Sequence, residues 1–353
     1  MEKEFTRLLM KWHTSQNKRE MPWKGETDPY KIWLSEVILQ QTRVAQGTSY
    51  YHSFLKKYPT IHHLSKAKDQ EVFKLWEGLG YYNRCKNLLF TAREISKNRK
   101  GVFPSTYPDL LALKGIGPYT AAAIASFAYN LPYAVVDGNV FRVLSRFFGI
   151  NTPIDTIKGK TLFSELAHRV LAKKKSALFN QAIMDFGAII CKPFSPICTN
   201  CSLHKSCIAY QKGRVNHLPV KEKIVLRKHR WLYYFVFEWE GKILLNHRIE
   251  KDIWENLFEF YLLEGEESIK WDNQKVTIWL ADQLGIVKAE LEDISPIMVQ
   301  QLTHQQIKGQ FMKIRLSQKP SILKGYQWET KKSLPKFPFP KYITGYLEKY
   351  PLI

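Results

Sequence analysis

The spacing of apolar residues predicts helices over the first two thirds of the chain. From residue 4 to about 215, apolar positions return at helical intervals between short polar, glycine or proline breaks, and no strand-like alternation persists. The longest periodic segment runs from Pro29 to Tyr51, and further helices are predicted at 69–77, 83–99, 106–112, 118–128, 138–149, 159–172 and 176–190. We therefore expect an all-α region here.

The pattern changes after about residue 215. The stretch RVNHLPVKEKIVLRK is basic and has no apolar period, so we predict a linker at 216–228. The next segment, WLYYFVFEWEGKILLNHRI, is aromatic and β-branched with Glu-Gly-Lys at its middle, which predicts a β-hairpin. One helix at about 274–285 and strand-like residues around 313–318 complete the expectation of an α+β second domain.

The length of the chain limits the number of domains, and its charge indicates the kind of partner. A chain of 353 residues has room for two or three domains, and 45% hydrophobic residues argue against a disordered basic tail. The net charge is +21, and residues 1–220 hold 32 basic and 15 acidic side chains, against 21 and 17 in residues 221–353. This concentration of positive charge in the helical region indicates a polyanion as the partner.

Neither a membrane span nor secretion is expected. The chain has no uninterrupted apolar run of about eighteen residues. Its start, MEKEFTRLLMKW, lacks the apolar core of a signal peptide. We therefore expect a cytoplasmic protein, associated with the nucleoid if the organism is bacterial.

Four of the five cysteines predict a metal site. Cys191, Cys198, Cys201 and Cys207 follow the spacing C-x6-C-x2-C-x5-C, whereas Cys85 lies far upstream. In a reducing compartment such a cluster is typical of zinc or of an iron–sulfur cluster, and the spacing alone leaves both open. Four unrelated buried thiols are the structural alternative. Cys85 is read as an ordinary helix residue.

A glycine-rich turn precedes one of the predicted helices. Gly115 and Gly117 in LKGIGPYT lead into the small-residue helix AAAIASFA. Free backbone N–H groups at such a helix start are suited to a phosphate oxygen. A tight connection between two helices is the alternative, but the basic composition favours the phosphate interpretation.

Two acidic residues are candidates for catalysis. Asp137 begins the predicted helix at 138–149, where it is either an ordinary helix cap or a carboxylate kept ionised to stabilise a cationic sugar. Glu36 stands among Trp, Val, Ile and Leu, so burial would raise its pKa toward that of a useful acid. A solvent-facing helical Glu is the alternative.

These motifs together resemble one family. LSEVILQQT, GLGYY, LKGIGPYTA, VVDGNVFRVL, FNQAIMDFGA and the cysteine spacing are similar to blocks of the adenine DNA glycosylases of the MutY group, in the helix-hairpin-helix superfamily with endonuclease III. The resemblance implies a multidomain protein with all-α helix-hairpin-helix glycosylase domains, an iron–sulfur cluster loop and an α+β, Nudix-like (MutT-like) C-terminal domain. The implied boundaries are 21–131 for a six-helix domain, 1–20 with 132–215 for the cluster domain, and 229–353 for the C-terminal domain.

The resemblance implies base-excision repair of adenine opposite 8-oxoguanine or guanine in double-stranded DNA. Glu36 would protonate the leaving adenine, Asp137 would stabilise the sugar cation, and Tyr119 and Asn139 would position them. Endonuclease III-like lyases hold a lysine where this chain has Tyr119, so a monofunctional hydrolase that leaves an abasic site is favoured. A glycosylase/lyase for oxidised pyrimidines and a non-enzymatic iron–sulfur DNA-binding protein are the alternatives.

Further residues take expected roles from the same resemblance. Arg19, Met21 and Trp23 would line the adenine pocket, and Gln41 and Tyr81 would wedge into the duplex beside the oxidised guanine. Without the resemblance, Tyr81 would be read as a core aromatic residue. The four clustered cysteines would hold one 4Fe-4S cluster, and the enzyme is expected to be a monomer.

The C-terminal domain is expected to recognise the lesion rather than hydrolyse nucleotides. A working Nudix hydrolase carries a Gly-x5-Glu-x7-Arg-Glu box, which is absent from residues 221–353. Gln301-Leu302-Thr303-His304 resembles the Phe-Ser-His loop that reads 8-oxoguanine, with Leu302 and Thr303 as departures. Thr303 keeps a hydroxyl and His304 keeps its donor, whereas the aromatic contact is lost.

Overall fold

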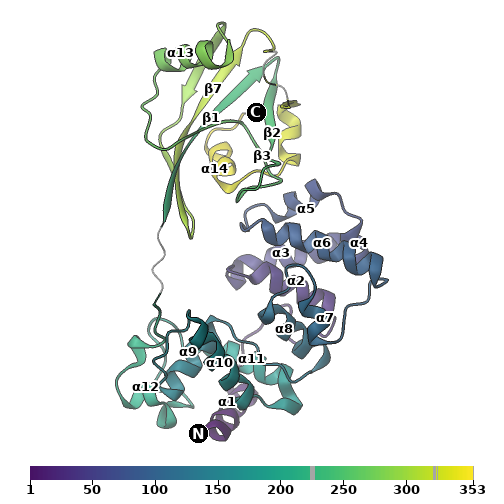
Figure 1. Cartoon of the computed structure of the whole chain (residues 1–353), viewed down its shortest axis with the longest axis vertical. Coiled ribbons are helices and arrows are strands. Elements are labelled where there is room, and N and C mark those ends of the chain that lie inside the picture. The colour runs from purple at the N-terminus through teal and green to yellow at the C-terminus, as the bar shows by residue number, and fades with distance from the viewer. Residues whose placement is uncertain (223–226, 321–322, 324, 353) are drawn as a thin grey trace. The chain divides into compact units, whose positions relative to one another are not determined.

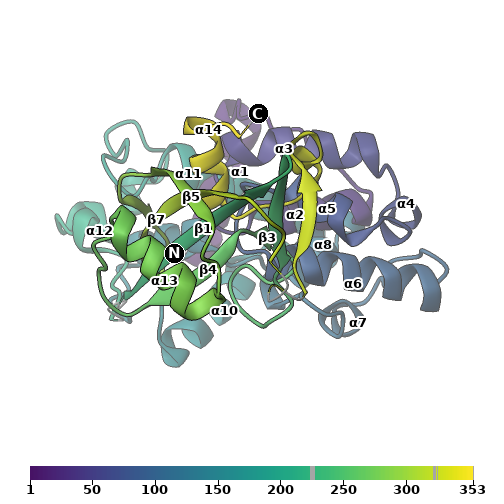
Figure 2. The ribbon, with the colours of Figure 1, turned by 90° about the horizontal axis from the view of Figure 1, so that it is seen from above.

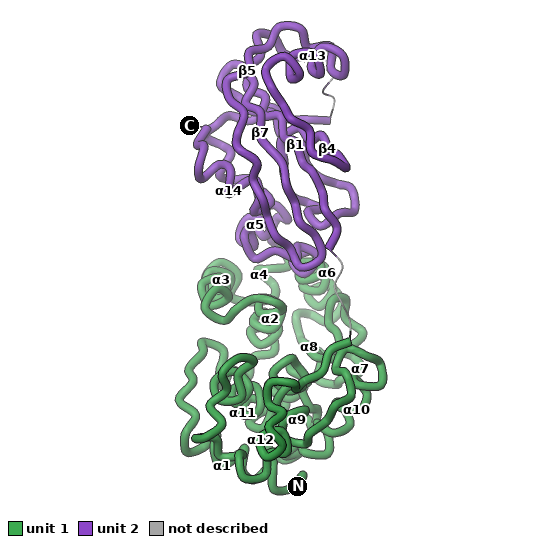
Figure 3. Tube along the Cα trace, turned by 90° about the vertical axis from the view of Figure 1, so that its left-hand side faces the viewer, with its two compact units in different colours: residues 1–66, 87–223 green, residues 67–86, 224–353 purple. Residues whose placement is uncertain are grey.

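The protein divides into two compact units in the computed structural model, which describes residues 1–222, 227–320, 323 and 325–352 (Figures 1 and 3). Unit 1 comprises Met1–Lys66 and Asn87–Lys223, and unit 2 comprises Ala67–Lys86 and Ile224–Ile353. Residues 223–226 of the predicted linker 216–228 lie outside the described residues. In the described ranges, no helix has the length and apolar character needed to cross a membrane.

Unit 1 is helical, which confirms the predicted all-α region. Its helices are α1 (Glu2–Gln16), α2 (Pro29–Leu39), α3 (Val44–Lys57), α4 (Ile61–Ser65), most of α6 (Asn83–Asn98), α7 (Tyr107–Leu111), α8 (Pro118–Tyr129), α9 (Gly138–Phe148), α10 (Ile157–Val170), α11 (Ser176–Ile189) and α12 (Ile208–Gln211). Short 3-10 helices cover Lys173–Lys175, His204–Ser206 and Val215–His217. Most predicted helix positions agree with these bounds within a few residues.

The expectation of one continuous helix from Pro29 to Tyr51 is wrong. α2 ends at Leu39 and α3 begins at Val44. Gln41 adopts a left-handed backbone with φ of 56°, which cannot continue a right-handed helix. The backbone N–H of Thr42 instead closes the turn on the Leu39 carbonyl at 3.1 Å. Apolar spacing continued across this break, so periodicity alone could not locate it.

The helices that carry the candidate site are held in place by the packing of their buried faces against one another. α1 packs with α9, α10 and α11 in one apolar core that includes Phe5, Trp12, Phe147 and Phe186. α8 is buried along most of its length because its Ala and Ser side chains permit close packing, and it packs against α2. The first turns of α8 and the middle of α2 are therefore neighbours.

Unit 2 contains a mixed β-sheet and confirms the α+β prediction (Figure 2). Its elements are α5 (Asp69–Trp76), β1 (Lys228–Trp239), β2 (Lys242–His247), β3 (Phe258–Glu259), β4 (Tyr261–Gly265), α13 (Asn273–Leu284), β5 (Ala289–Ile294), β6 (Met298–Gln301), β7 (Gln305–Leu316), β8 (Gln327–Thr330), a 3-10 helix at Lys331–Lys336 and α14 (Lys341–Lys349). β1 and β7 pair in parallel, and the other recorded pairs are antiparallel.

Both faces of the central strand are covered. Tyr233, Phe235 and Phe237 share a core with α13, while Tyr234 contacts Tyr342 of α14. Successive residues of a strand point to opposite faces, so the unbroken apolar run of β1 is explained by burial on both sides. The predicted hairpin is present, and Glu240 and Gly241 at its turn have φ of 47° and 72°.

Residues 67–86 lie within the predicted boundaries 21–131 and share contacts with the C-terminal part of unit 2. The Glu77 carboxylate accepts a hydrogen bond from the Phe339 N–H at 2.7 Å, and Lys74 Nζ donates to the Phe337 carbonyl at 3.1 Å. Side chains of one segment and backbone groups of another hold this arrangement. Local sequence patterns do not reveal such pairings.

Candidate active site

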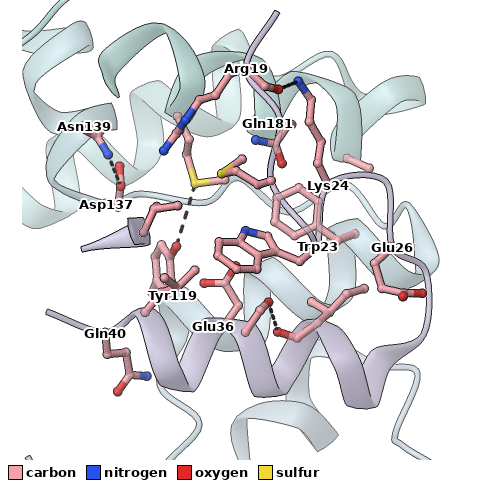
Figure 4. Close-up of a pocket in the computed structure, with 18 of the residues that line it drawn as sticks. Arg19, Trp23, Lys24, Glu26, Glu36, Gln40, Tyr119, Asp137, Asn139 and Gln181 are labelled. Atoms are coloured by element: carbon pink, nitrogen blue, oxygen red, sulfur yellow. Dashed lines mark hydrogen bonds between the residues drawn. The ribbon is translucent and has the colours of Figure 1, made fainter. Parts of the chain in front are cut away.

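One cavity of about 960 Å³ in unit 1 brings together the expected catalytic and pocket residues (Figure 4). Glu36 enters it from α2 and Tyr119 from α8, while Asp137 and Asn139 enter it at the start of α9. Arg19, Met21 and Trp23, on the segment between α1 and α2, also line the cavity. Three helices and one connecting segment therefore converge on a single space.

Glu36 is a buried acid. Its residue exposure is 7%, because α2 is buried on nearly all sides. Burial raises the pKa of the Glu36 carboxyl to about 7; the nearby Asp137 carboxylate acts in the same direction, and a hydrogen bond with Tyr119 opposes the rise. A substantial fraction of this carboxyl is thus protonated at neutral pH and can donate a proton.

Asp137 caps helix α9 and is held by several donors. Its Oδ1 accepts the Val140 N–H at 2.8 Å, and its Oδ2 accepts from Asn139 Nδ2 at 2.8 Å. Arg142 Nη2 in turn donates to Asn139 Oδ1 at 2.8 Å. Burial raises the pKa of Asp137 above its ordinary value, while these donors and Arg142 oppose that rise. The helix start and Asn139 therefore limit the effect of burial rather than reverse it.

Tyr119 lies within reach of both carboxyl groups. Burial, together with the charges of Glu36 and Asp137, raises the pKa of its hydroxyl well above the ordinary value, so the group remains a hydrogen-bond donor. The hydroxyl hydrogen-bonds with the Glu36 carboxyl and also donates to Met184 Sδ at 3.8 Å, a weak acceptor. Tyr119 therefore helps to hold the Glu36 carboxyl in the cavity.

Several residues of the cavity wall are not among those singled out from the sequence. Lys24, Gln181 and Met184 line the cavity, and Asp185 next to Met184 is fully buried. Gln181 to Asp185 fall in the block FNQAIMDFGA, where the one charged residue of helix α11 was the available signal. Trp23 is held in turn by edge contact with Tyr51, with ring centroids 5.4 Å apart.

The glycine-rich turn leads directly into α8. Gly115 has φ of 79°, and a Cβ there would lie 2.7 Å from Cβ of Asn87, so the tight turn requires glycine. Thr91 Oγ1 donates to the Lys114 carbonyl at 2.7 Å and fixes the turn. Gly117 precedes α8 and no side chain caps that helix start. Its first N–H groups therefore remain suited to an anion.

Both expected wedge residues have strained backbones. Gln41 of unit 1 is exposed at the cavity rim with φ of 56°, and Tyr81 of unit 2 is 41% exposed with φ of 50°. Left-handed backbones cost residues other than glycine roughly 1–2 kcal/mol. The exposure of Tyr81 shows that it is not the core aromatic residue that would be expected without the family resemblance.

The loop at 302–304 lies beside Tyr81 within unit 2. Tyr81 Oη and Thr303 Oγ1 form a hydrogen bond of 2.5 Å. The Leu302 N–H donates to the Gln305 carbonyl at 2.8 Å, and the His304 carbonyl accepts from the Lys228 N–H at 2.9 Å. Thr303 and His304 are exposed, so the backbone is fixed while both side chains face solvent.

The four clustered cysteines line a second, apolar cavity of unit 1. Arg146 Nη1 donates to Cys191 Sγ at 3.4 Å, and the Leu203 N–H donates to Cys201 Sγ at 3.4 Å. Burial and the neighbouring thiols raise the pKa of Cys201 to about 12 despite the Leu203 N–H. Four thiolates here would need additional positive charge. The donor set therefore fits a soft metal group bound by sulfur.

Two arginines of helix α9 contact the backbone at the start of the cysteine segment. Arg142 Nε donates to the Cys191 carbonyl at 2.7 Å, and Arg146 Nη1 donates to the Lys192 carbonyl at 2.7 Å. Two arginines of α9 therefore fix the start of the cysteine segment.

Comparisons with known families agree with both units. Residues 34–169 match the model of the HhH-GPD superfamily of base excision DNA repair proteins, and residues 233–349 match that of the NUDIX domain. Adenine DNA glycosylase of Buchnera aphidicola subsp. Schizaphis graminum is 34% identical over 270 residues, which cover 76% of this chain and 77% of the relative. The Rattus norvegicus adenine DNA glycosylase is 40% identical over 228 residues, which cover 61% of this chain and 44% of that protein.

Solved structures resemble the helical part. A thermostable thymine-DNA glycosylase matches with a TM-score of 0.55 and 31% identity, over 60% of this chain and 97% of its own. Endonuclease III in a non-covalent DNA complex matches with a TM-score of 0.52 and 21% identity, over 60% of this chain and 97% of its own. The second similarity establishes a shared fold only.

Proposed function

The chain belongs to the adenine DNA glycosylases, which are base-excision DNA repair enzymes, and from this membership we propose its substrate and mechanism. The substrate is adenine paired with 8-oxoguanine or guanine in double-stranded DNA. The enzyme, acting as a monomer, hydrolyses the N-glycosidic bond and leaves an abasic site without cutting the strand. The proposed site of action is the cytoplasm, at the nucleoid if the organism is bacterial.

The observation that carries the proposal is a pair of carboxyl groups with different environments in one cavity. Burial holds the pKa of Glu36 at about 7, while Asp137 keeps donors on both oxygens. A protonated acid beside an ionised carboxylate is the division of labour that glycoside hydrolysis uses. The arrangement supports protonation of the leaving group and stabilisation of the sugar within one step.

Each residue of the cavity then has a chemical task. The adenine is rotated out of the duplex into the cavity. Glu36 donates its proton to a ring nitrogen of adenine as the glycosidic bond breaks, so that the base leaves neutral. The Asp137 carboxylate stabilises the oxocarbenium-like sugar, through a transient covalent adduct that water then resolves. Tyr119 and Asn139 position these groups, and Arg19, Met21 and Trp23 enclose the base.

Residues outside the cavity hold the DNA. The turn at Gly115 and Gly117 presents the unpaired N–H groups at the start of α8 to a backbone phosphate. Gln41 and Tyr81 fill the space that the adenine leaves in the stack. Thr303 and His304 read the base opposite the adenine. The excess of basic residues in the first 220 positions attracts the duplex as a whole.

The four cysteines hold one 4Fe-4S cluster. Four thiols lining one cavity fit either zinc or an iron–sulfur cluster, and the family resemblance favours the iron–sulfur cluster. When bound, the cluster would cross-link the segment 191–207 through its four cysteine thiolates, and its positively charged core would offset their negative charge. The absorption spectrum of the purified protein distinguishes the two, because zinc sites are colourless and iron–sulfur clusters absorb visible light.

The first experiment measures adenine release from duplexes with adenine opposite 8-oxoguanine, with enzyme in excess. We expect Glu36→Gln, which keeps the shape but cannot donate this proton, to slow release by about 10³-fold while the affinity for the duplex is retained. Asp109→Asn, an acid-to-amide change on exposed α7, is the matched control and should leave the rate unchanged. Undiminished release by Glu36→Gln would remove this residue from the role of acid.

The same samples test the lyase alternative. A lyase forms a Schiff base between a lysine and the sugar, and borohydride traps it as a covalent complex. Tyr119 provides no amine, so we expect trapping no greater than for the Glu36→Gln variant. Efficient trapping by the wild-type protein, or strand cleavage at the rate of base loss, would favour the alternative over the monofunctional hydrolase.

A further inference from the structure

The fully buried carboxylate of Asp185 organises one wall of the cavity. Its exposure is 0%. Arg19 Nη1 at 2.8 Å and Gln181 Nε2 at 2.9 Å donate to Oδ1. Asn17 Nδ2 donates to Oδ2 at 2.8 Å, and Lys24 Nζ lies 3.5 Å from the same oxygen. The two carboxylate oxygens therefore accept from three donors and pair with a further cation, and of these four side chains Arg19, Lys24 and Gln181 line the cavity.

These contacts fix a segment that has no regular secondary structure for most of its length. Residues 17–28 connect α1 to α2, and Arg19, Met21 and Trp23 on this segment face the cavity (Figure 4). Lys24 Nζ also donates to the Arg19 carbonyl at 2.6 Å. Trp23 also contacts Tyr51 of α3, and backbone hydrogen bonds shape the turn at residues 21–26. Asp185 anchors the segment to helix α11 at Asn17, Arg19 and Lys24.

Asp185 also determines the charge and orientation of the groups around the cavity. Arg19 and Lys24 are two cations side by side, and the buried carboxylate compensates their repulsion. A carboxylate only accepts hydrogen bonds, so Gln181 must turn its NH₂ toward Asp185, which fixes the orientation of that amide. Without the carboxylate, Arg19 and Gln181 would lose these hydrogen bonds, and Lys24 would keep its bond to the Arg19 carbonyl.

We propose that Asp185 is a positioning residue for the base in the cavity: it acts through Arg19, Lys24 and Gln181 and has no contact with the substrate. The inference rests on the proposed adenine excision. It implies that loss of the carboxylate misplaces the extruded base relative to Glu36 and Asp137. A misplacement of about 1 Å costs roughly 10²-fold in rate.

The test is the rate constant of adenine release by Asp185→Asn with enzyme in excess over DNA. Under this condition the rate constant does not depend on the fraction of enzyme that is folded, so a destabilised but correctly built site would react normally. We expect a decrease of roughly 10²-fold, with duplex affinity within about twofold of the wild type because phosphate contacts dominate it. Asp155→Asn, at an acid of unit 1 that binds the Glu222 N–H, is the matched control.

A double-mutant cycle then tests the route of the effect. If Asp185 acts through the cations, the double variant Arg19→Gln/Asp185→Asn should release adenine at about the same rate as the slower of the two single variants. Asp185→Glu, which retains the charge, should recover part of the rate. A wild-type rate for Asp185→Asn, or additive losses in the double variant, would overturn the inference. If the wild-type protein releases no adenine, the proposed function falls and takes this inference with it.

Discussion

The cavity of unit 1 and the exposed group of Tyr81, Thr303 and His304 in unit 2 are built in opposite ways. In the cavity, Glu36 is buried and Asp137 has donors on both oxygens. In the exposed group, one hydrogen bond joins Tyr81 to Thr303 and the side chains face solvent. Bond cleavage requires groups that are desolvated and fixed in advance, whereas recognition requires groups that DNA can reach. Changes in the cavity should therefore have much larger effects.

The largest effect that this comparison predicts comes from pH. Glu36 must carry a proton to act as an acid, and its pKa is about 7. Well above that pH, kcat/KM for adenine release should fall about tenfold per pH unit, which amounts to roughly 50-fold from pH 7 to pH 9 because half of the carboxyl is already ionised at pH 7. At acidic pH, protonation of Asp137 should reduce the rate. Because burial raises the pKa of Asp137, this decrease should begin at a higher pH than it would for an ordinary Asp.

A rate profile over pH 5–9 checks this prediction, and Glu36→Gln is its control. The residual rate of the variant should lose the decline above pH 7. Stability offers a second check, because the folded state holds the Glu36 proton to a higher pH than the unfolded chain does. The wild type should therefore lose stability relative to Glu36→Gln between about pH 4.5 and 7. A flat wild-type rate would contradict the assignment.

The difference between the two regions also explains what the sequence could predict. A helix that is apolar on all sides is buried. The residues around Glu36 have that composition, yet their pattern left a solvent-facing Glu open, and the burial of α2 resolved the question. Local composition and helix position made Glu36 and Asp137 candidates, and the family resemblance assigned their tasks and that of Tyr119. Periodicity predicted helices at these places but not the meeting of the three side chains in one cavity.

What the sequence missed depends on contacts between distant segments. Asp185 anchors residues 17–24 from helix α11, more than 160 positions away. Residues 67–86 hydrogen-bond to residues 336–339 of the same unit, although their composition matches that of the helical region. The break at Gln41 is a local feature, but glutamine carries no signal for a left-handed backbone. Neither propensity nor apolar spacing contains this information.

Gln41 is exposed although it belongs to unit 1. Substituting it therefore tests whether the size of an effect on adenine release follows from burial or from membership of unit 1. Glycine adopts the required backbone without strain. Gln41→Gly should therefore raise the stability of unit 1 by about 0.5–1 kcal/mol, seen as a Tm increase of about 2 °C. At the same time the loss of the wedge should slow adenine release about tenfold, because less interaction compensates the extruded base.

The opposite signs of these two effects make the experiment informative. Glu240→Gly, at the left-handed position of the hairpin turn in unit 2, relieves the same kind of strain and should leave release unchanged. A Gln41→Gly protein that is less stable would show that the left-handed backbone carries no strain. A more stable protein with wild-type activity would show that Gln41 has no part in opening the duplex.

The smallest expected effect concerns the choice of the base opposite adenine. Thr303→Val keeps the shape of the side chain but removes the hydroxyl that bonds to Tyr81 at 2.5 Å. One hydrogen bond between exposed groups contributes about 1 kcal/mol, so the preference for 8-oxoguanine over guanine should fall about fivefold. The rate on the preferred duplex should change less than this ratio. Thr303→Ser retains the hydroxyl and should retain the preference for 8-oxoguanine. The same preference in Thr303→Val and Thr303→Ser would mean that recognition does not use the Tyr81–Thr303 hydrogen bond.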